Sequence, residues 1–256
     1  MSALAVALLG PATVASAGNG VTEDELKRPS DVDPQVAAGE LLPFTVGARH
    51  ERQGILIGGY GGFDSAKRTP LMEGRLDATL IENITLRATM TNVGMSDVLQ
   101  PSVGLLVDVL REDRSGIDVA IGGDYENASW SARVPAVVTR AALGSTIGLT
   151  RIQANAAFGL GVERGERYGD LRLSGFHPVA KQLYAGLDTR ARVDLERDTD
   201  EPSGELDWDV QAGPVASLAL GRFAVSATGG VSAWKARSGE SAKVGAVAAV
   251  GLGAAF

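Results

Sequence analysis

The chain has 256 residues, of which 45% are hydrophobic and 21% charged, and its formal net charge is -7. This composition excludes a disordered chain, the lack of cysteine excludes disulfides and thiolate chemistry, and the acidic balance argues against a nucleic-acid partner. The 33 glycines suit β structure with many turns, and the length suits one domain. Beyond the N-terminus, no apolar run is long enough for a membrane-spanning helix.

The first residues have the features of an export signal. Residues 3–9 are apolar, and residues 14–17 (VASA) are the small residues that precede a signal-peptidase cleavage site. The basic segment that normally opens such a signal is missing, since Lys27 is the first positive side chain, so we expect the natural start to lie further upstream. A short apolar helix of the folded protein is the alternative. Residues 18–50 are largely polar and predict a periplasmic lead-in with the composition of a disordered segment.

Residues 183–195 alternate between two faces in a way that predicts a membrane strand. A helix, at about 100° per residue, would scatter the charges around its axis, whereas a strand, at about 180° per residue, collects them on one face. A strand in a membrane barrel turns every second side chain toward lipid and the others toward the lumen. The predicted lipid-facing set is Leu183, Ala185, Leu187, Thr189, Ala191, Val193 and Leu195.

The same alternation recurs along the chain, with Val215 as an exception in residues 206–220. It predicts about twelve strands, an even number as bacterial single-chain barrels require. A further strand at Phe44–Arg49 would change the parity, and the count stays open between about ten and fourteen. The predicted strands are 54–63, 72–80, 84–92, 102–111, 117–125, 132–140, 147–162, 168–176, 182–195, 206–220, 223–234 and 244–256.

The links between these strands alternate between short and long, as periplasmic turns and extracellular loops do. Short links are predicted at 81–83, 112–116 and 221–222, the last a Gly-Arg pair suited to a type II′ turn. Longer links are predicted at 62–71, 91–101, 196–205 and 235–243. With the N-terminus in the periplasm, the C-terminus also lies there.

The last strand alternates apolar residues from Val244 to Phe256, the final residue. In this, the chain resembles the outer-membrane β-barrel proteins of Gram-negative bacteria, which typically end in such a strand with a terminal aromatic. The resemblance implies an all-β fold, an antiparallel transmembrane barrel at 51–256 after a signal peptide at 1–17. It also implies outer-membrane lipids and the barrel-assembly machinery as partners, the latter recognising Phe256. Candidates for the aromatic girdles at the membrane interfaces are Trp130, Trp208, Trp234, Tyr60, Tyr125 and Tyr168.

Charged side chains of both signs are predicted to face the lumen. A tight turn after residue 80 sets Leu80 opposite Ile84 and Asp77 opposite Arg87, and a symmetric hairpin sets Arg192 opposite Asp209. Such charges line a narrow path for small solutes or knit together into a plug, and the sequence does not separate these outcomes. The predicted lumen-facing set is Asp77, Arg87, Arg151, Arg172, Asp188, Arg190, Arg192, Asp194, Asp207 and Asp209.

No motif in the sequence predicts an enzyme, a cofactor or a metal site. The two histidines, His50 before the first strand and His177 in a predicted turn, have no predicted partner. The glycines at 58–62 lack the following helix that a phosphate-binding loop needs, and the acids at 198–205 lack the spacing of a calcium loop. Two other readings stay open: a soluble exported barrel with its apolar face inward around a small hydrophobic ligand, and an adhesin or anchor that acts through its loops.

Overall fold

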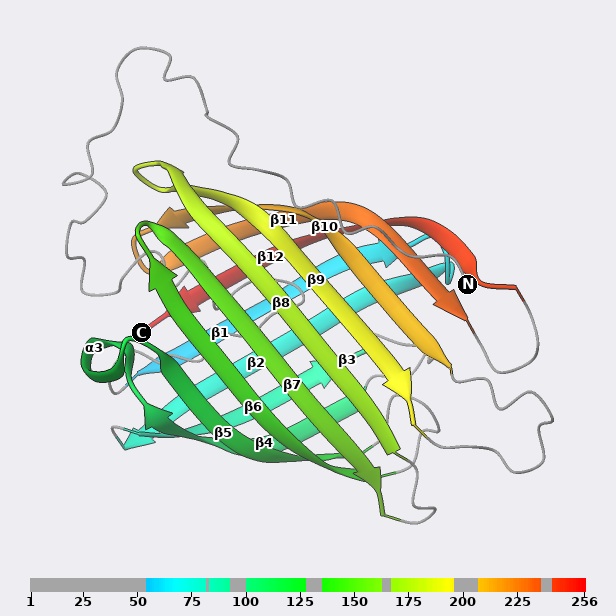
Figure 1. The fold of residues 1–256 in the computed structure, drawn as a ribbon, viewed down its shortest axis with the longest axis horizontal. Helices are drawn as coiled ribbons and strands as arrows, with labels where there is room; N and C mark the ends of the chain where they lie inside the picture. Colours follow the sequence, from blue (N-terminus) through cyan, green and yellow to red (C-terminus); the bar gives the residue numbers. More distant parts are fainter. Residues whose placement is uncertain are drawn as a thin grey trace.

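The computed structural model describes residues 54–81, 83–92, 100–127, 135–162, 167–195, 207–235 and 241–256. The predicted signal peptide, lead-in and extra strand, with His50 and Trp130, lie outside these ranges, as do much of the longer links on which the adhesin reading depends. The described residues form twelve antiparallel strands that close into one barrel in chain order (Figure 1). The strands are β1 (Ile55–Asp64), β2 (Thr69–Ile81), β3 (Ile84–Thr91), β4 (Gln100–Leu110), β5 (Asp118–Glu126), β6 (Ala136–Ile147), β7 (Thr150–Gly161), β8 (Arg167–Ala180), β9 (Leu183–Asp194), β10 (Trp208–Leu220), β11 (Phe223–Lys235) and β12 (Lys243–Ala255).

The first and last strands close the barrel. β1 pairs antiparallel with β12, from Leu56 opposite Ala255 to Asp64 opposite Val247. Two further backbone bonds extend the seam, because Phe256 N donates to Ile55 O at 2.8 Å and Ile55 N donates to Phe256 O at 2.9 Å. The predicted closed sheet with an even number of strands is confirmed.

The links sort the barrel into two ends. At the short-link end lie residue 256, helix α3 (Glu112–Ser115) and tight turns such as Gly221-Arg222 (Figure 1). Gly221 has a φ of 64°, and the only described non-glycine residue with a positive φ is Arg68. A positive φ at the first central residue alone fits the predicted type II′ turn. The strand ends at the opposite end of the barrel, which we call the long-link end, flank most of the longer links, so the predicted alternation is confirmed there. Two links depart from it: the predicted long link 62–71 is a four-residue turn at 65–68, and the link with α3 at the short-link end runs over residues 111–117.

Several details of the strand prediction are wrong. A hairpin turn with Gly148 at a φ of 63° interrupts the predicted strand 147–162, because β6 continues to Ile147. The predicted strand 132–140 ends too early, because β6 runs to Ile147. The alanines and the glycine near residue 142 have low β propensity, but pairing with β5 and β7 holds them in the strand. A bulge next to Leu80 sets Ile81, not Leu80, opposite Ile84.

His177 lies in strand β8 and not in a turn. It pairs with Ala185, its side chain is exposed on the outer wall, and its Nδ1 lies 3.0 Å from Thr150 Oγ1. The register shifts between Pro178 and Ala180. Proline has no N–H for the ladder and is tolerated at such an irregularity, which lets the strand continue past the predicted end.

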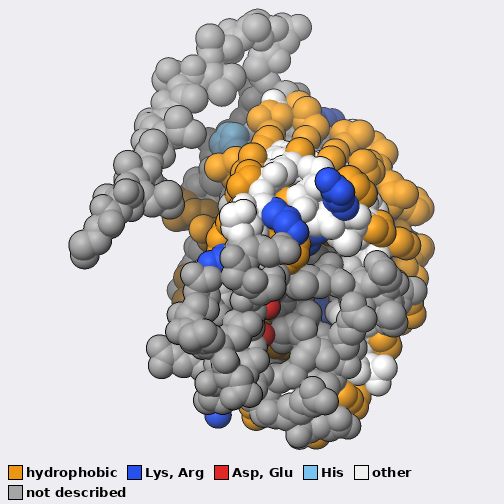
Figure 2. Space-filling view, turned by 90° about the vertical axis from the view of Figure 1, so that its right-hand side faces the viewer, with side chains coloured by type: hydrophobic (Ala, Val, Ile, Leu, Met, Phe, Trp, Pro, Cys, Tyr) orange, Lys and Arg blue, Asp and Glu red, His pale blue; other side chains and the backbone are white. Residues whose placement is uncertain are grey.

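The outer wall of the barrel is apolar. Large side chains such as Leu171 and Val250 are 58% and 55% exposed, and comparable ones occur on every strand. Figure 2, which looks at the long-link end, shows hydrophobic side chains along the outer wall. Soluble monomers rarely expose continuous apolar patches of this kind, because water disfavours them. The outer wall is therefore the lipid-facing surface of a membrane barrel, and the soluble reading with an inward apolar face is wrong.

None of the described helices is long and apolar enough to cross a membrane.

Small apolar clusters fill parts of the interior. Val215 is 4% exposed and packs with Phe176, Tyr184 and Ala219. The Phe176 and Tyr184 rings meet edge to face with centroids 6.2 Å apart. Val215 is an apolar residue at an inward-facing position of β10, where polar residues are expected, because it packs in this hydrophobic cluster.

The aromatic residues divide between the two faces of the wall. Tyr125 is 47% exposed on the outside, and Trp234 lies near the long-link end with Lys243 Nζ 5.1 Å from its ring centroid. Tyr60 and Tyr168 are buried inside the barrel, so their assignment to the girdles is wrong. Both occupy positions that alternate with outward residues, and each hydroxyl donates to a carboxylate, Tyr60 to Glu73 and Tyr168 to Glu126. Trp208 is half-buried at the start of β10.

Candidate functional site

The candidate site is the polar lumen. All ten charged residues predicted to face it are described; Asp207, just before β10, is half-buried, and the other nine are buried. They lie at the positions that alternate with the apolar outer wall. Asp188 and Asp194 are on β9 with Arg190 and Arg192.

The predicted pair of Asp77 and Arg87 is present at the middle of β2 and β3. The two residues are directly opposite, and Arg87 donates from Nε to Asp77 Oδ1 at 2.8 Å and from Nη2 to Oδ2 at 2.9 Å. Arg75, two residues earlier on the same face, donates from Nε to Asp77 Oδ2 at 2.7 Å. One carboxylate therefore holds two guanidinium groups, and Arg75 is a lumen residue that the strand's alternation could have identified.

Across the lumen, three arginines surround Asp170 of β8. Arg172 donates to it from Nε and Nη2, each at 3.0 Å, and Arg190 donates from Nε at 3.1 Å and from Nη2 at 2.7 Å. Arg192, opposite Asp170 in the register, places Nε 3.2 Å from Oδ2. Asp170, which was absent from the predicted set, is the centre of this cluster, which we call the Asp170 cluster.

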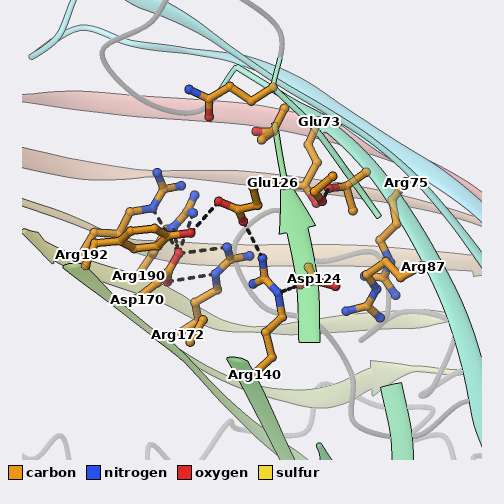
Figure 3. A pocket seen from close by; sticks show the side chains of 16 residues that line it. Glu73, Arg75, Arg87, Asp124, Glu126, Arg140, Asp170, Arg172, Arg190 and Arg192 are labelled. Carbon is orange, nitrogen blue, oxygen red and sulfur yellow. Dashed lines mark hydrogen bonds and ion pairs between the residues drawn. The ribbon is translucent and has the colours of Figure 1, made fainter. Parts of the chain in front are cut away.

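A chain of polar contacts joins β8 to β5 and β6 (Figure 3). The Tyr168 hydroxyl donates to Glu126 Oε2 at 2.5 Å, and Arg140 Nη2 donates to Glu126 Oε1 at 2.9 Å. Arg140 Nε also donates to Asp124. The Tyr168 ring lies over Gly159, its partner in the β7–β8 register, where a Cβ would overlap the ring. Only glycine leaves room for the ring at this place.

We expect Gly159→Ala to destabilise the barrel by about 1–3 kcal/mol, because the added methyl must displace the Tyr168 ring and its bond to Glu126. The measurement is a urea titration of the protein folded in vesicles. Gly61→Ala is the matched control, since a Cβ there has open space around it. Equal losses in both variants would contradict this account of Gly159.

A turn folds into the long-link opening. Lys67, in the turn between β1 and β2, donates from Nζ to Asp209 Oδ2 of β10 at 2.5 Å. Asp64 accepts from Gln211 Nε2 at 2.9 Å and from Ser232 Oγ at 2.7 Å. Burial lowers the pKa of Lys67, although the charges of Asp209 and Asp64 oppose this shift. Arg192 is opposite Asp209 as predicted, and Lys67 also binds Asp209.

A second contact ties α3 into the short-link opening. Arg151 of β7 donates from Nη2 to Asp118 Oδ2 of β5 at 2.6 Å and from Nη1 to Glu112 of α3. Glu112 N donates to Asp118 Oδ1 at 2.7 Å. The first residue of α3 is thereby held against the inside of the barrel.

The free space between these groups is small. A central cavity of about 60 Å³ is lined by six arginines and four carboxylates among its sixteen residues. Figure 3 shows Arg172, Arg190 and Arg192 on one side of it, and Arg75 and Arg87 on the other. Since about 10–15 Å³ of such space holds one water molecule, this cavity suits a few waters or a small solute. Within the described ranges, no group of three or more His, Asp or Glu side chains is arranged to hold a metal ion.

No family model matches the sequence, and no curated protein matches it. Solved structures do match: the NanC porin is 7% identical, with a TM-score of 0.55 over 78% of this chain and 98% of that chain. A loop-deletion mutant of OmpT from Vibrio cholerae is 11% identical (TM-score 0.44; 79% and 97% covered), and the outer-membrane channel DcaP of Acinetobacter baumannii is 9% identical (TM-score 0.44; 79% and 72% covered). The chain has the fold of an integral outer-membrane β-barrel protein.

Proposed function

We propose that this chain is a narrow conduit in the outer membrane of a Gram-negative bacterium, and not an enzyme. The observation that carries the proposal is the central cavity, whose charged walls come from strands on opposite sides of the barrel. A polar interior inside an apolar wall is what a path for water and small hydrophilic solutes needs. The long-link end faces the cell exterior in this proposal, as in other bacterial barrels.

Planar-bilayer recordings on the purified full chain test the conduit. Discrete conductance steps are expected, and they should be small because the cavity is narrow. Lys67→Ala should raise the conductance, since it removes a side chain that extends from the turn between β1 and β2 into the long-link opening, where it binds Asp209. Lys243→Ala is the matched control, because Lys243 lies against Trp234.

A second candidate function is a closed structural barrel. It is favoured by the small size of the cavity and by the ion pairs on its walls, which hold the strands together. The recordings separate the two functions. A bilayer that stays silent with both the natural chain and Lys67→Ala would remove the conduit and leave the structural role.

The position of Phe256 supports a role in assembly. Its side chain is 60% exposed and its backbone completes the seam with Ile55. We expect deletion of Phe256 to lower the yield of folded barrel in cells severalfold, and Phe256→Tyr to retain most of it. Heat-dependent gel mobility of the membrane fraction measures the folded share. Unchanged refolding of the deletion variant into vesicles would assign the loss to recognition by the assembly machinery, whereas equal yields in cells would contradict the role.

A further inference from the structure

The Asp170 cluster holds more positive groups than its carboxylate can bind. Both oxygens of Asp170 accept from Arg172, and Oδ2 also accepts twice from Arg190. Oδ2 is therefore shared by several donors, and Arg192 Nε lies at 3.2 Å from the same atom. The acceptor capacity of this oxygen is used up.

One donor in the cluster points to a missing acceptor. Arg190 is 5% exposed, and its Nη1 is buried without a hydrogen-bond partner among the described residues. Buried donors of a charged group are almost always satisfied, because the loss of their hydration is unfavourable. An acceptor from the lumen, rather than from the wall, would complete the guanidinium.

The surroundings of Arg190 favour an anion as that acceptor. Arg190 lines the central cavity together with Arg140, Arg172 and Arg192. The carboxylates nearest to Arg140 are already engaged, since Glu126 accepts from Tyr168 and Arg140, and Asp124 accepts from Arg140. The planar guanidinium fork matches the paired oxygens of a carboxylate or a phosphate.

We propose that the lumen has a binding site for a small oxyanion, a carboxylate or a phosphate, beside Arg190. The anion accepts from Arg190 Nη1 and is held by the positive field of the arginines around Asp170. This inference rests on the proposed conduit only in that the lumen must admit the anion. The site would make the long-link half of the lumen a stopping point for small anionic solutes.

Binding is measured on the full chain folded in detergent micelles, by calorimetric titration with inorganic phosphate and, separately, with acetate. Saturable binding of at least one of them is expected. Binding of phosphate alone would assign the site to tetrahedral oxyanions, and binding of acetate alone to carboxylates. No saturable binding of either, which would leave water as the acceptor, would overturn the site.

Three variants locate the binding. Arg190→Gln should weaken the affinity at least tenfold, and Arg222→Gln, in a turn at the short-link end, should leave it unchanged. Arg190→Lys keeps the positive charge but lacks the planar guanidinium fork, so it too should weaken binding. It provides a second test if Arg190→Gln does not fold. Unchanged affinity in a folded Arg190 variant would overturn the site.

Bilayer recordings on the same preparation keep the two proposals apart. Anion binding without conductance would support the site and remove the conduit. Conductance without binding would remove the site and support the conduit.

Discussion

Val250→Arg is expected to destabilise the folded barrel by about 2–4 kcal/mol, the cost of placing an arginine on the lipid face near the bilayer midplane. Val250 is near the middle of β12, and its side chain is 55% exposed on the outer wall. The guanidinium of a residue at this depth cannot reach the headgroups without distorting the bilayer, so it loses its hydration. Urea titration in phospholipid vesicles, followed by tryptophan fluorescence, measures the free energy of unfolding.

Val244→Arg is the matched control on the same strand and the same face. Val244 is the second residue of β12, at the long-link end, and is 73% exposed. Near the interface, an arginine on the lipid face costs about 0–1 kcal/mol, because the side chain extends to the headgroups. Equal losses at the two positions would mean that depth has no effect, and the outer wall would then not be in contact with acyl chains.

Asp170→Asn is expected to cost about 3–5 kcal/mol of unfolding free energy, with the value nearer the lower limit because the adjoining cavity can admit water. The substitution keeps the shape of the side chain but removes the negative charge at the centre of the Asp170 cluster. Arg172 and Arg190 are then buried beside each other without the carboxylate that both of them bind. The same urea titration measures the loss.

Two further variants test the electrostatic cause. Asp113→Asn removes a carboxylate that is 53% exposed and lies 3.6 Å from Arg111 Nε, so its cost should be about 0–1 kcal/mol. Adding Arg190→Gln to Asp170→Asn removes one of the uncompensated cations and should recover part of the lost stability. A double variant less stable than Asp170→Asn alone would show that packing, rather than charge, dominates the cluster.

The fold was predictable because lipid and lumen impose opposite demands on neighbouring residues. A strand with Leu171 and Leu173 facing acyl chains must turn Arg172 inward, and this parity also places the nine buried charges of the predicted set. Tyr168 shares that parity, so the same pattern contained the signal that it faces the lumen. Its aromatic ring is typical of an interfacial girdle, but its place in the alternation decides which way it faces.

The contacts inside the lumen were predictable only where they are local. The pair of Asp77 and Arg87 follows from one short hairpin. Lys67 could not be placed, because a turn residue has no alternation and its partner Asp209 is 142 positions away. The size of the cavity depends on how twelve strands close and on how far each arginine extends, which no single segment encodes.

The seam between β1 and β12 differs from the charged walls in having few large side chains. Eight of its nine register pairs contain a glycine or an alanine, from Leu56 opposite Ala255 to Phe63 opposite Ala248. Such pairs contribute little cross-strand contact beyond the packing of Tyr60 with Val247 and Ala249, so the backbone ladder carries most of this joint. When the barrel is pulled apart mechanically, the wall should unzip here first, and a sideways exit from the interior into the bilayer would open along the same line.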